Sequence, residues 1–190
     1  MSEKTYPHIL KLSEMKKRDV DIVYENASIY EKLDGGNVQI DIGDNITFGY
    51  RSGKNKPGRD IYWAKDFEKF FWLNKDSFSG LKKGIYFGEF LASHRIENKE
   101  EYINNFFLID IFVDGKFLDY KPARKRVKDV PIIKTLDTLY EGKINDIIIK
   151  KVLDMESPYT EDGRPEGIVI KNYDKQLFVK TYYPGNENPD

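Results

Sequence analysis

The chain has 190 residues, and its 31 lysine and arginine residues against 32 aspartate and glutamate residues give a formal net charge of −1. This balance excludes a protein that holds polyanions through an overall basic field, so any contact with nucleic acid has to be local. The absence of cysteine excludes disulfides, thiolate metal sites and a cysteine nucleophile. No segment approaches the roughly eighteen apolar residues of a membrane span, and we expect a soluble, cytoplasmic protein without a membrane partner, folded as one domain over residues 1–190.

Alternating apolar residues and glycine-centred turns predict an antiparallel meander in the first part of the chain. Its expected strands are at 28–33, 38–42 and 46–51, joined at Gly35-Gly36 and at Gly43-Asp44-Asn45.

Beyond residue 60, helical and strand patterns alternate irregularly, and Asp114-Gly115 is the clearest hairpin signal. Because tight hairpins force antiparallel pairing, the pattern favours the α+β class over a doubly wound parallel sheet. The expected elements are an amphipathic helix at 62–73, a strand at 85–91, a short helix at 97–105, strands at 106–113 and 116–120, a basic segment at 121–129, a helix at 142–153 and strands at 167–171 and 176–182.

The most informative string is Glu31-Lys32-Leu33-Asp34-Gly35-Gly36-Asn37, in which a lysine ends a predicted strand just before two glycines. Strand alternation places Tyr30, Lys32 and Asp34 on one face, and glycines allow a ligand close to the backbone. A lysine amine becomes a nucleophile when desolvation or neighbouring positive charge lowers its pKa from the ordinary value of about 10.4. The string therefore indicates covalent chemistry at Lys32, with a plain surface strand as the alternative.

Four further strings follow in order, and a last strand carries Phe178-Val179-Lys180-Thr181-Tyr182. Together with Lys32-Leu33-Asp34-Gly35 they resemble the ordered motifs of the covalent nucleotidyltransferases, which comprise DNA ligases, RNA ligases and mRNA capping enzymes. Within that superfamily the chain most resembles RNA ligases of the RNA ligase 2 type, from about residue 6 to residue 182. The four strings are Tyr50-Arg51-Ser52-Gly53, Tyr86-Phe87-Gly88-Glu89-Phe90, Phe107-Leu108-Ile109-Asp110-Ile111 and Glu166-Gly167-Ile168-Val169-Ile170-Lys171.

The resemblance implies an antiparallel-sheet, ATP-grasp-like nucleotidyltransferase domain with interspersed helices and no OB domain. It also implies an ATP-dependent RNA ligase: Lys32 attacks the α-phosphorus of ATP, and AMP passes to an RNA 5′-phosphate. A 3′-hydroxyl then displaces AMP and seals the strand, as in RNA repair. Because each step is a phosphoryl or nucleotidyl transfer, a divalent ion, Mg²⁺, is expected to neutralise charge.

Residue roles follow from the same resemblance. Lys32, Glu166 and Lys180 are expected to be catalytic, and Glu166 is also expected to bind the metal, because carboxylate oxygens suit Mg²⁺. Glu89 is expected on the ribose and Arg51 near the phosphates or ribose. The full set of expected cofactor-binding residues is Glu31, Asn37, Arg51, Glu89, Ile109, Val169 and Lys171.

The chain departs from the family pattern at three places. Ile109 stands where an aromatic residue usually stacks on adenine, and Val169, Phe107 or Phe112 are the alternative covers for the base. Tyr182 stands where RNA ligases commonly carry a second lysine. Only eight residues follow Tyr182, so we expect a catalytic core without the usual C-terminal domain, either as a minimal ligase or as a fragment.

Several alternatives stay open at this level. The basic segment 121–128 and the cations of the loop after Ser52 track RNA phosphates or are solvated surface. Asp110 is expected to be a hydrogen-bonded structural carboxylate, and His8 and His94 ordinary surface residues. The competing functions are a DNA ligase or capping-type core and a degenerate nucleotide- or RNA-binding module. The natural RNA, a separate RNA-binding partner and the oligomeric state are not determined by the sequence.

Overall fold

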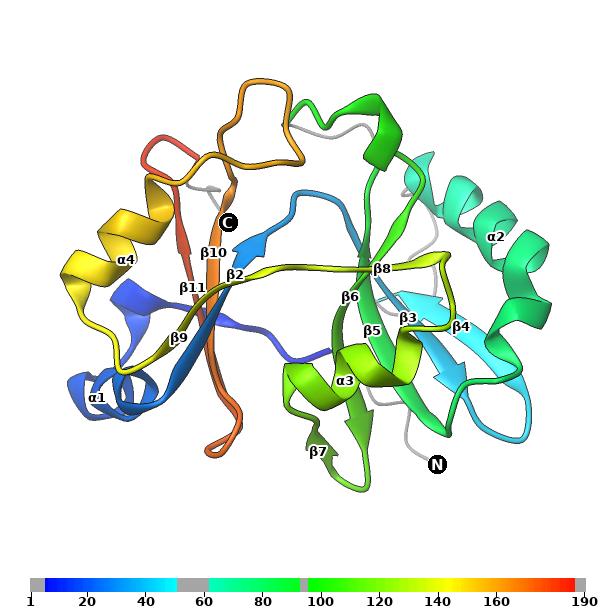
Figure 1. Ribbon diagram of the computed structural model, residues 1–190, viewed down its shortest axis with the longest axis horizontal. Coiled ribbons are helices and arrows are strands. Elements are labelled where there is room, and N and C mark those ends of the chain that lie inside the picture. The colour runs from blue at the N-terminus through cyan, green and yellow to red at the C-terminus, as the bar shows by residue number, and fades with distance from the viewer. Residues whose placement is uncertain (1–5, 51–61, 93–95, 187–190) are drawn as a thin grey trace. The chain divides into compact units, whose positions relative to one another are not determined.

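The computed structural model describes residues 6–50, 62–92 and 96–186 (Figure 1). The chain divides into two compact units, and each is built on its own sheet. Unit 1 comprises Met1–Pro7, Gly35–His94 and Glu100–Thr135, and unit 2 comprises His8–Asp34, Arg95–Lys99 and Leu136–Asp190.

Unit 2 contains a five-stranded sheet in the order β1-β11-β10-β2-β9, antiparallel except for the short pairing of β1 with β11. Helices α1 and α4 lie along one face of this sheet (Figure 1). The elements are β1 (Leu10–Lys11), α1 (Lys17–Glu25), β2 (Ala27–Lys32), β9 (Thr138–Gly142), α4 (Asp146–Leu153), β10 (Gly167–Asn172) and β11 (Leu177–Tyr182), with a 3₁₀ turn at Leu12–Glu14.

Alternation along the three central strands gives this sheet two different faces. Apolar side chains at alternate positions of β2, β10 and β11 pack against α1 and α4. The intervening positions put the other side chains on the opposite face, among them Lys32 and Lys180. The apolar members of the core are Val23, Ala27, Ile29, Ile144, Ile149, Val152, Ile168, Ile170 and Val179.

Unit 1 contains a second sheet in the order β4-β3-β5-β6-β7, with β8 pairing in parallel to β6. Helix α2 covers β3 and β4 with aromatic side chains: Phe67 and Phe71 are fully buried and both contact Phe48. The elements are β3 (Gly36–Ile42), β4 (Ile46–Tyr50), α2 (Tyr62–Asn74), β5 (Gly84–Phe90), β6 (Phe106–Val113), β7 (Lys116–Phe117), α3 (Tyr120–Val127) and β8 (Ile133–Thr135), with 3₁₀ turns at Lys75–Phe78 and Glu100–Tyr102.

These antiparallel sheets with interspersed helices confirm the predicted α+β class. The hairpin at Asp114-Gly115 is also confirmed, since both residues adopt positive φ and β6 pairs with β7. The expected single domain over residues 1–190 stays a prediction.

The meander prediction was wrong at its first turn. Strands β2 and β3 do not pair with each other but belong to different sheets, so Gly35-Gly36 is a crossing between units and not a hairpin. Both positions require glycine because there is no room for a side chain. A Cβ on Gly35 would lie 2.5 Å from the carbonyl oxygen of Phe90, and one on Gly36 would lie 2.6 Å from the Trp63 ring.

Helix boundaries also differ from expectation. The segment 97–105 forms only a short 3₁₀ turn, and the helix expected at 142–153 begins at Asp146, where the Asn145 side chain accepts a hydrogen bond from the Ile148 N–H as an N-cap. Strands β1, β8 and β9 and helices α1 and α3 were not predicted, and the strand expected at 116–120 ends at Phe117. Among the described residues, no helix is both long enough and apolar enough to span a bilayer.

Candidate active site

Lys32 ends strand β2 on the sheet face opposite the unit 2 core. Its cross-strand neighbour on β10 is Gly167, and Gly167 in turn faces Tyr182 on β11. The three residues therefore form one row across three strands, with a glycine in the middle. Because Gly167 has no side chain, the side chains of Lys32 and Tyr182 meet above it, and the Lys32 Nζ lies 5.5 Å from the centre of the Tyr182 ring.

The backbone around Gly167 admits no larger residue. A Cβ at this position would lie 2.2 Å from the Thr181 carbonyl oxygen and 2.8 Å from the Tyr182 Cα. The glycine of the Glu-Gly pair is thus required by the close approach of β11.

Glu166 precedes β10 and forms an ion pair with Lys32, its carboxylate accepting from the Lys32 Nζ. The Glu166 side chain is only 3% exposed, whereas Lys32 is 21% exposed. A carboxylate this buried is stabilised only when a cation or several donors contact it. The structure therefore brings together the two residues that the sequence assigned to nucleophile and metal ligand.

Lys180 lies in the next row of the same face, where Val169 separates it from Tyr30. Its Nζ lies 5.4 Å from the centre of the Tyr182 ring. Tyr182 is therefore in cation–π distance of both lysines at once. The sequence predicted Lys32 and Lys180 as site residues but treated Tyr182 only as a missing lysine; strand parity alone would have placed its ring on this face.

Lys171, expected to bind the nucleotide, is 2% exposed and surrounded by aromatic rings. Its Nζ lies 5.3 to 5.7 Å from the ring centres of Tyr30, Tyr173 and Phe178. This enclosure holds the ammonium against rings of its own unit, and the assignments of Lys171 and Val169 to the nucleotide stay predictions.

Glu31 has the opposite orientation from its neighbour Lys32. It shares a face with Ile29 and the core, and the Ser157 hydroxyl donates to its carboxylate. Burial raises the pKa of the Glu31 carboxyl to about 7, although the Ser157 hydrogen bond acts in the other direction. The predicted role of Glu31 in nucleotide binding stays a prediction, and Ser157 was not anticipated.

In unit 1, Glu89 and Asn37 face each other across β5 and β3. The Glu89 carboxylate accepts hydrogen bonds from the Gly35 N–H at 3.2 Å and from the Asn37 amide at 3.4 Å. Glu89 thus holds the glycine crossing in place, and its ribose contact stays a prediction.

Ile109 is the additional residue of a β-bulge, because Phe87 pairs with Asp110 and Gly88 pairs with Leu108. Bulges redirect side chains and are frequent near functional sites. Ile109 is half-buried, and its place beside the adenine stays a prediction.

Asp110 is fully buried and accepts a hydrogen bond from the Tyr6 hydroxyl, which confirms its expected structural role. His8 is exposed, as expected. Arg51, the cations of the following loop and His94 lie outside the described residues.

The described residues contain no group of three or more histidine, aspartate or glutamate side chains placed to hold a metal ion by themselves. Magnesium, however, commonly binds to one or two carboxylates together with substrate phosphates and water. Glu166 is a carboxylate of this kind, on the face that carries Lys32 and Lys180.

Comparison with known proteins gives a match to one protein family. The RNA ligase family model matches residues 25–182. No curated protein matches the chain in sequence.

Solved structures of Naegleria gruberi RNA ligase share the fold. The structure with PPi has 16% identity and a TM-score of 0.68 over 95% of this chain, and a mutant with ATP and Mn has 16% identity and a TM-score of 0.64 over 93%. The chain spans only 56% and 54% of the length of these two structures.

Burial of Glu31 predicts a specific pH dependence of stability. The unfolded carboxyl titrates near 4.5 and the folded one near 7, so between these values the folded chain keeps a proton that the unfolded chain has lost. The contribution of the Glu31 carboxyl to the free energy of unfolding is therefore fully present below pH 4.5. It is lost as the pH rises to 7, which lowers the free energy of unfolding by up to about 3 kcal/mol. In urea unfolding from pH 4.5 to 7.5, Glu31→Gln should reduce this fall, whereas exposed Glu156→Gln should not. Parallel curves for wild type and Glu31→Gln would contradict the assignment.

Proposed function

The chain belongs to the RNA ligase family, and we propose that it is an ATP-dependent RNA ligase that works through a covalent adenylate on Lys32. The observation that supports this most directly is the ion pair of Lys32 with buried Glu166 on a sheet face that also presents Lys180. Such a face offers a nucleophile, a carboxylate and a second cation.

The proposed first step is attack of the Lys32 Nζ on the α-phosphorus of ATP. The ammonium first gives up a proton, and the Glu166 carboxylate, which already accepts from it, is placed to receive that proton or to hold the amine in line. A nitrogen–phosphorus bond forms while the bond from the α-phosphorus to the leaving oxygen breaks, so pyrophosphate departs and AMP remains on Lys32.

The two later steps move AMP to RNA and then release it. A 5′-phosphate oxygen of the RNA attacks the adenylate phosphorus, the bond to Lys32 breaks, and the RNA carries a 5′–5′ pyrophosphate linkage to AMP. A 3′-hydroxyl then attacks the RNA 5′-phosphate, loses its proton and expels AMP, which leaves a phosphodiester. Both steps depend on in-line positioning and on charge neutralisation.

The negative charge of the phosphates has to be neutralised in each step, and few described residues can contribute to this. Lys180 contributes a compact positive charge to the phosphates, and Glu166 together with the phosphates of ATP would hold Mg²⁺. When bound, the ion supplies further neutralisation of the phosphate oxygens. The ATP and Mn in the Naegleria gruberi RNA ligase mutant structure support ATP and a divalent ion for this chain.

Other parts of the proposal come from the resemblance alone. Glu89 and Asn37 are assigned to the ribose and the α-phosphate, and the partner is an RNA with 5′-phosphate and 3′-hydroxyl ends. We further propose a role in RNA repair in the cytoplasm.

The test of the proposal is covalent labelling. The protein should become labelled by α-labelled ATP but not by α-labelled GTP in the presence of magnesium, and the label should survive denaturing electrophoresis. Lys32→Ala should abolish it, because the other amine assigned to this face, that of Lys180, lies in the next row and is proposed to contact the phosphates, whereas exposed Lys175→Ala should retain it. Labelling from GTP would favour a capping-type enzyme, and persistent label in Lys32→Ala would refute the nucleophile.

Glu166→Gln tests the carboxylate separately from the nucleophile. The substitution keeps the size of the side chain but removes its charge, so the rate of adenylation should fall on the order of 100-fold, as for other lost groups that stabilise transition-state charge. The exposed Glu161→Gln should be neutral in the same single-turnover assay. A near-normal rate in folded Glu166→Gln would show that its charge is dispensable.

Tyr182 is proposed to position the Lys32 ammonium through its ring. Tyr182→Phe keeps the ring and should keep the rate, whereas Tyr182→Leu should slow adenylation roughly 2- to 30-fold, which corresponds to a cation–π contact of about 0.5 to 2 kcal/mol. The Tyr182→Leu loss should lie in the single-turnover rate and not in the ATP concentration that gives half-maximal rate. Equal losses in both variants would instead assign the effect to the hydroxyl group.

A further inference from the structure

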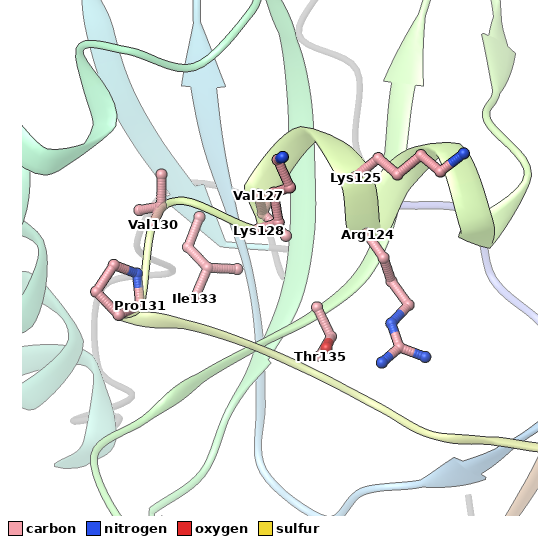
Figure 2. Close-up of a pocket in the computed structure, with 8 residues that line it drawn as sticks. All are labelled: Arg124, Lys125, Val127, Lys128, Val130, Pro131, Ile133 and Thr135. Carbon is pink, nitrogen blue, oxygen red and sulfur yellow. The ribbon is translucent and has the colours of Figure 1, made fainter.

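A pocket of about 300 Å³ opens in unit 1 where α3 passes into β8. It contains none of the residues assigned to adenylation. Figure 2 shows Val130, Pro131 and Ile133 on one side of it and Arg124 on the other, beside Thr135. The lining consists of Arg124, Lys125, Val127, Lys128, Val130, Pro131, Ile133 and Thr135.

The charge of this lining is of one sign. Three of its eight side chains are cationic and none is a carboxylate. The Lys128 Nζ lies 3.9 Å from the Asp129 carboxylate, but both side chains are exposed, so this contact is weak. The pocket therefore favours an anionic ligand.

The rest of the lining is apolar. Val127, Val130 and Ile133 are buried in the fold and present hydrocarbon to the pocket, while Thr135 adds a hydroxyl. Basic residues in the last turn also favour the C-terminal end of a helix, but that explanation does not account for an apolar hollow beside them. A volume of this size is at the lower end of small-ligand pockets.

We propose that this pocket binds one nucleotide of a single-stranded RNA segment, with the phosphate against Lys125 and Lys128 and the base or ribose against the apolar wall. Cations that contact the phosphates are common to RNA-binding surfaces, and here aliphatic side chains in place of aromatic ones lie beside them. This inference rests on the proposed function for its choice of RNA as ligand. It adds a binding site for RNA outside the residues that carry the adenylate.

Neighbouring basic residues supply matched controls. Arg126 belongs to the same helix but donates to the Lys83 carbonyl and does not line the pocket. Lys134 is exposed and lies on β8 between Ile133 and Thr135, both of which line the pocket, while Lys134 itself does not. Lys121 is exposed on the first turn of α3 and is likewise outside the lining.

The experiment compares two double variants that remove equal charge. Binding of a fluorescein-labelled, single-stranded RNA oligonucleotide is measured by anisotropy over a series of salt concentrations. Lys125→Gln/Lys128→Gln should weaken binding roughly tenfold and reduce the slope of log affinity against log salt by about 1.4, the value for two lost phosphate contacts. Lys121→Gln/Lys134→Gln should change both quantities much less.

A second arm tests the apolar wall with the charges left in place. Thr135→Phe fills the pocket from β8 and should weaken RNA binding without changing the salt slope. If the two lysine double variants weaken RNA binding equally, or if Lys125→Gln/Lys128→Gln does not weaken it, the proposal that RNA binds in this pocket is wrong. Polyglutamate of matched charge should compete poorly, and competition as strong as that of unlabelled RNA would overturn RNA in favour of an acidic protein segment.

Self-adenylation of the same samples separates the two proposals. Neither double variant alters the Lys32 face, so labelling by ATP should be unchanged in both. If wild type binds RNA through the pocket but is not labelled by ATP, the proposed function fails and the pocket stands. If wild type is labelled but none of the pocket variants alters RNA affinity, the proposed function stands and the pocket fails.

Discussion

The ion pair between Lys32 and Glu166 links the charged face of unit 2 to the register of its sheet. A carboxylate that is 3% exposed is costly unless a cation contacts it, and this contact requires β2 and β10 to hold one register. A slip of one residue would turn Lys32 toward the core and Ile29 toward the other face. The apolar side chains beneath the sheet therefore fix the geometry of the charged face above it, because they are what the register places against α1 and α4.

The same strand shows what this arrangement costs. Glu31 and Lys32 are adjacent, so strand alternation must turn one of them inward. It is the glutamate that lies on the core side, where the Ser157 hydroxyl donates a hydrogen bond to its carboxylate. Its raised pKa records that cost. A strand that ends in adjacent glutamate and lysine residues can keep its lysine on the open face only by turning the glutamate carboxyl group toward the core.

Features that depend on neighbouring residues could be predicted from the sequence. Features that depend on contacts between residues far apart in the chain could not. Asp114-Gly115 specifies a hairpin because both φ values are positive, and alternation placed Lys32 on the same strand face as Tyr30, the face opposite the core. Gly35-Gly36 has the same appearance in sequence, yet it is required by the Phe90 carbonyl and the Trp63 ring, which lie far along the chain. No local pattern distinguishes a glycine needed for backbone conformation from one needed for space. For the same reason the ring of Tyr182 over Lys32 depends on a register that only the folded sheet reveals.

Tyr182 also changes the electrostatics of the face. A lysine in its place would stand across Gly167 from Lys32, and the two ammonium groups would repel each other. The tyrosine ring replaces this repulsion with attraction to both Lys32 and Lys180. The face thereby has one cation fewer to neutralise phosphate, and Lys32, the proposed nucleophile, is in contact with the ring before any nucleotide binds. Under the proposed function, such a face depends more on Lys180, and on cations outside it, for the positive charge that ATP and RNA phosphates require.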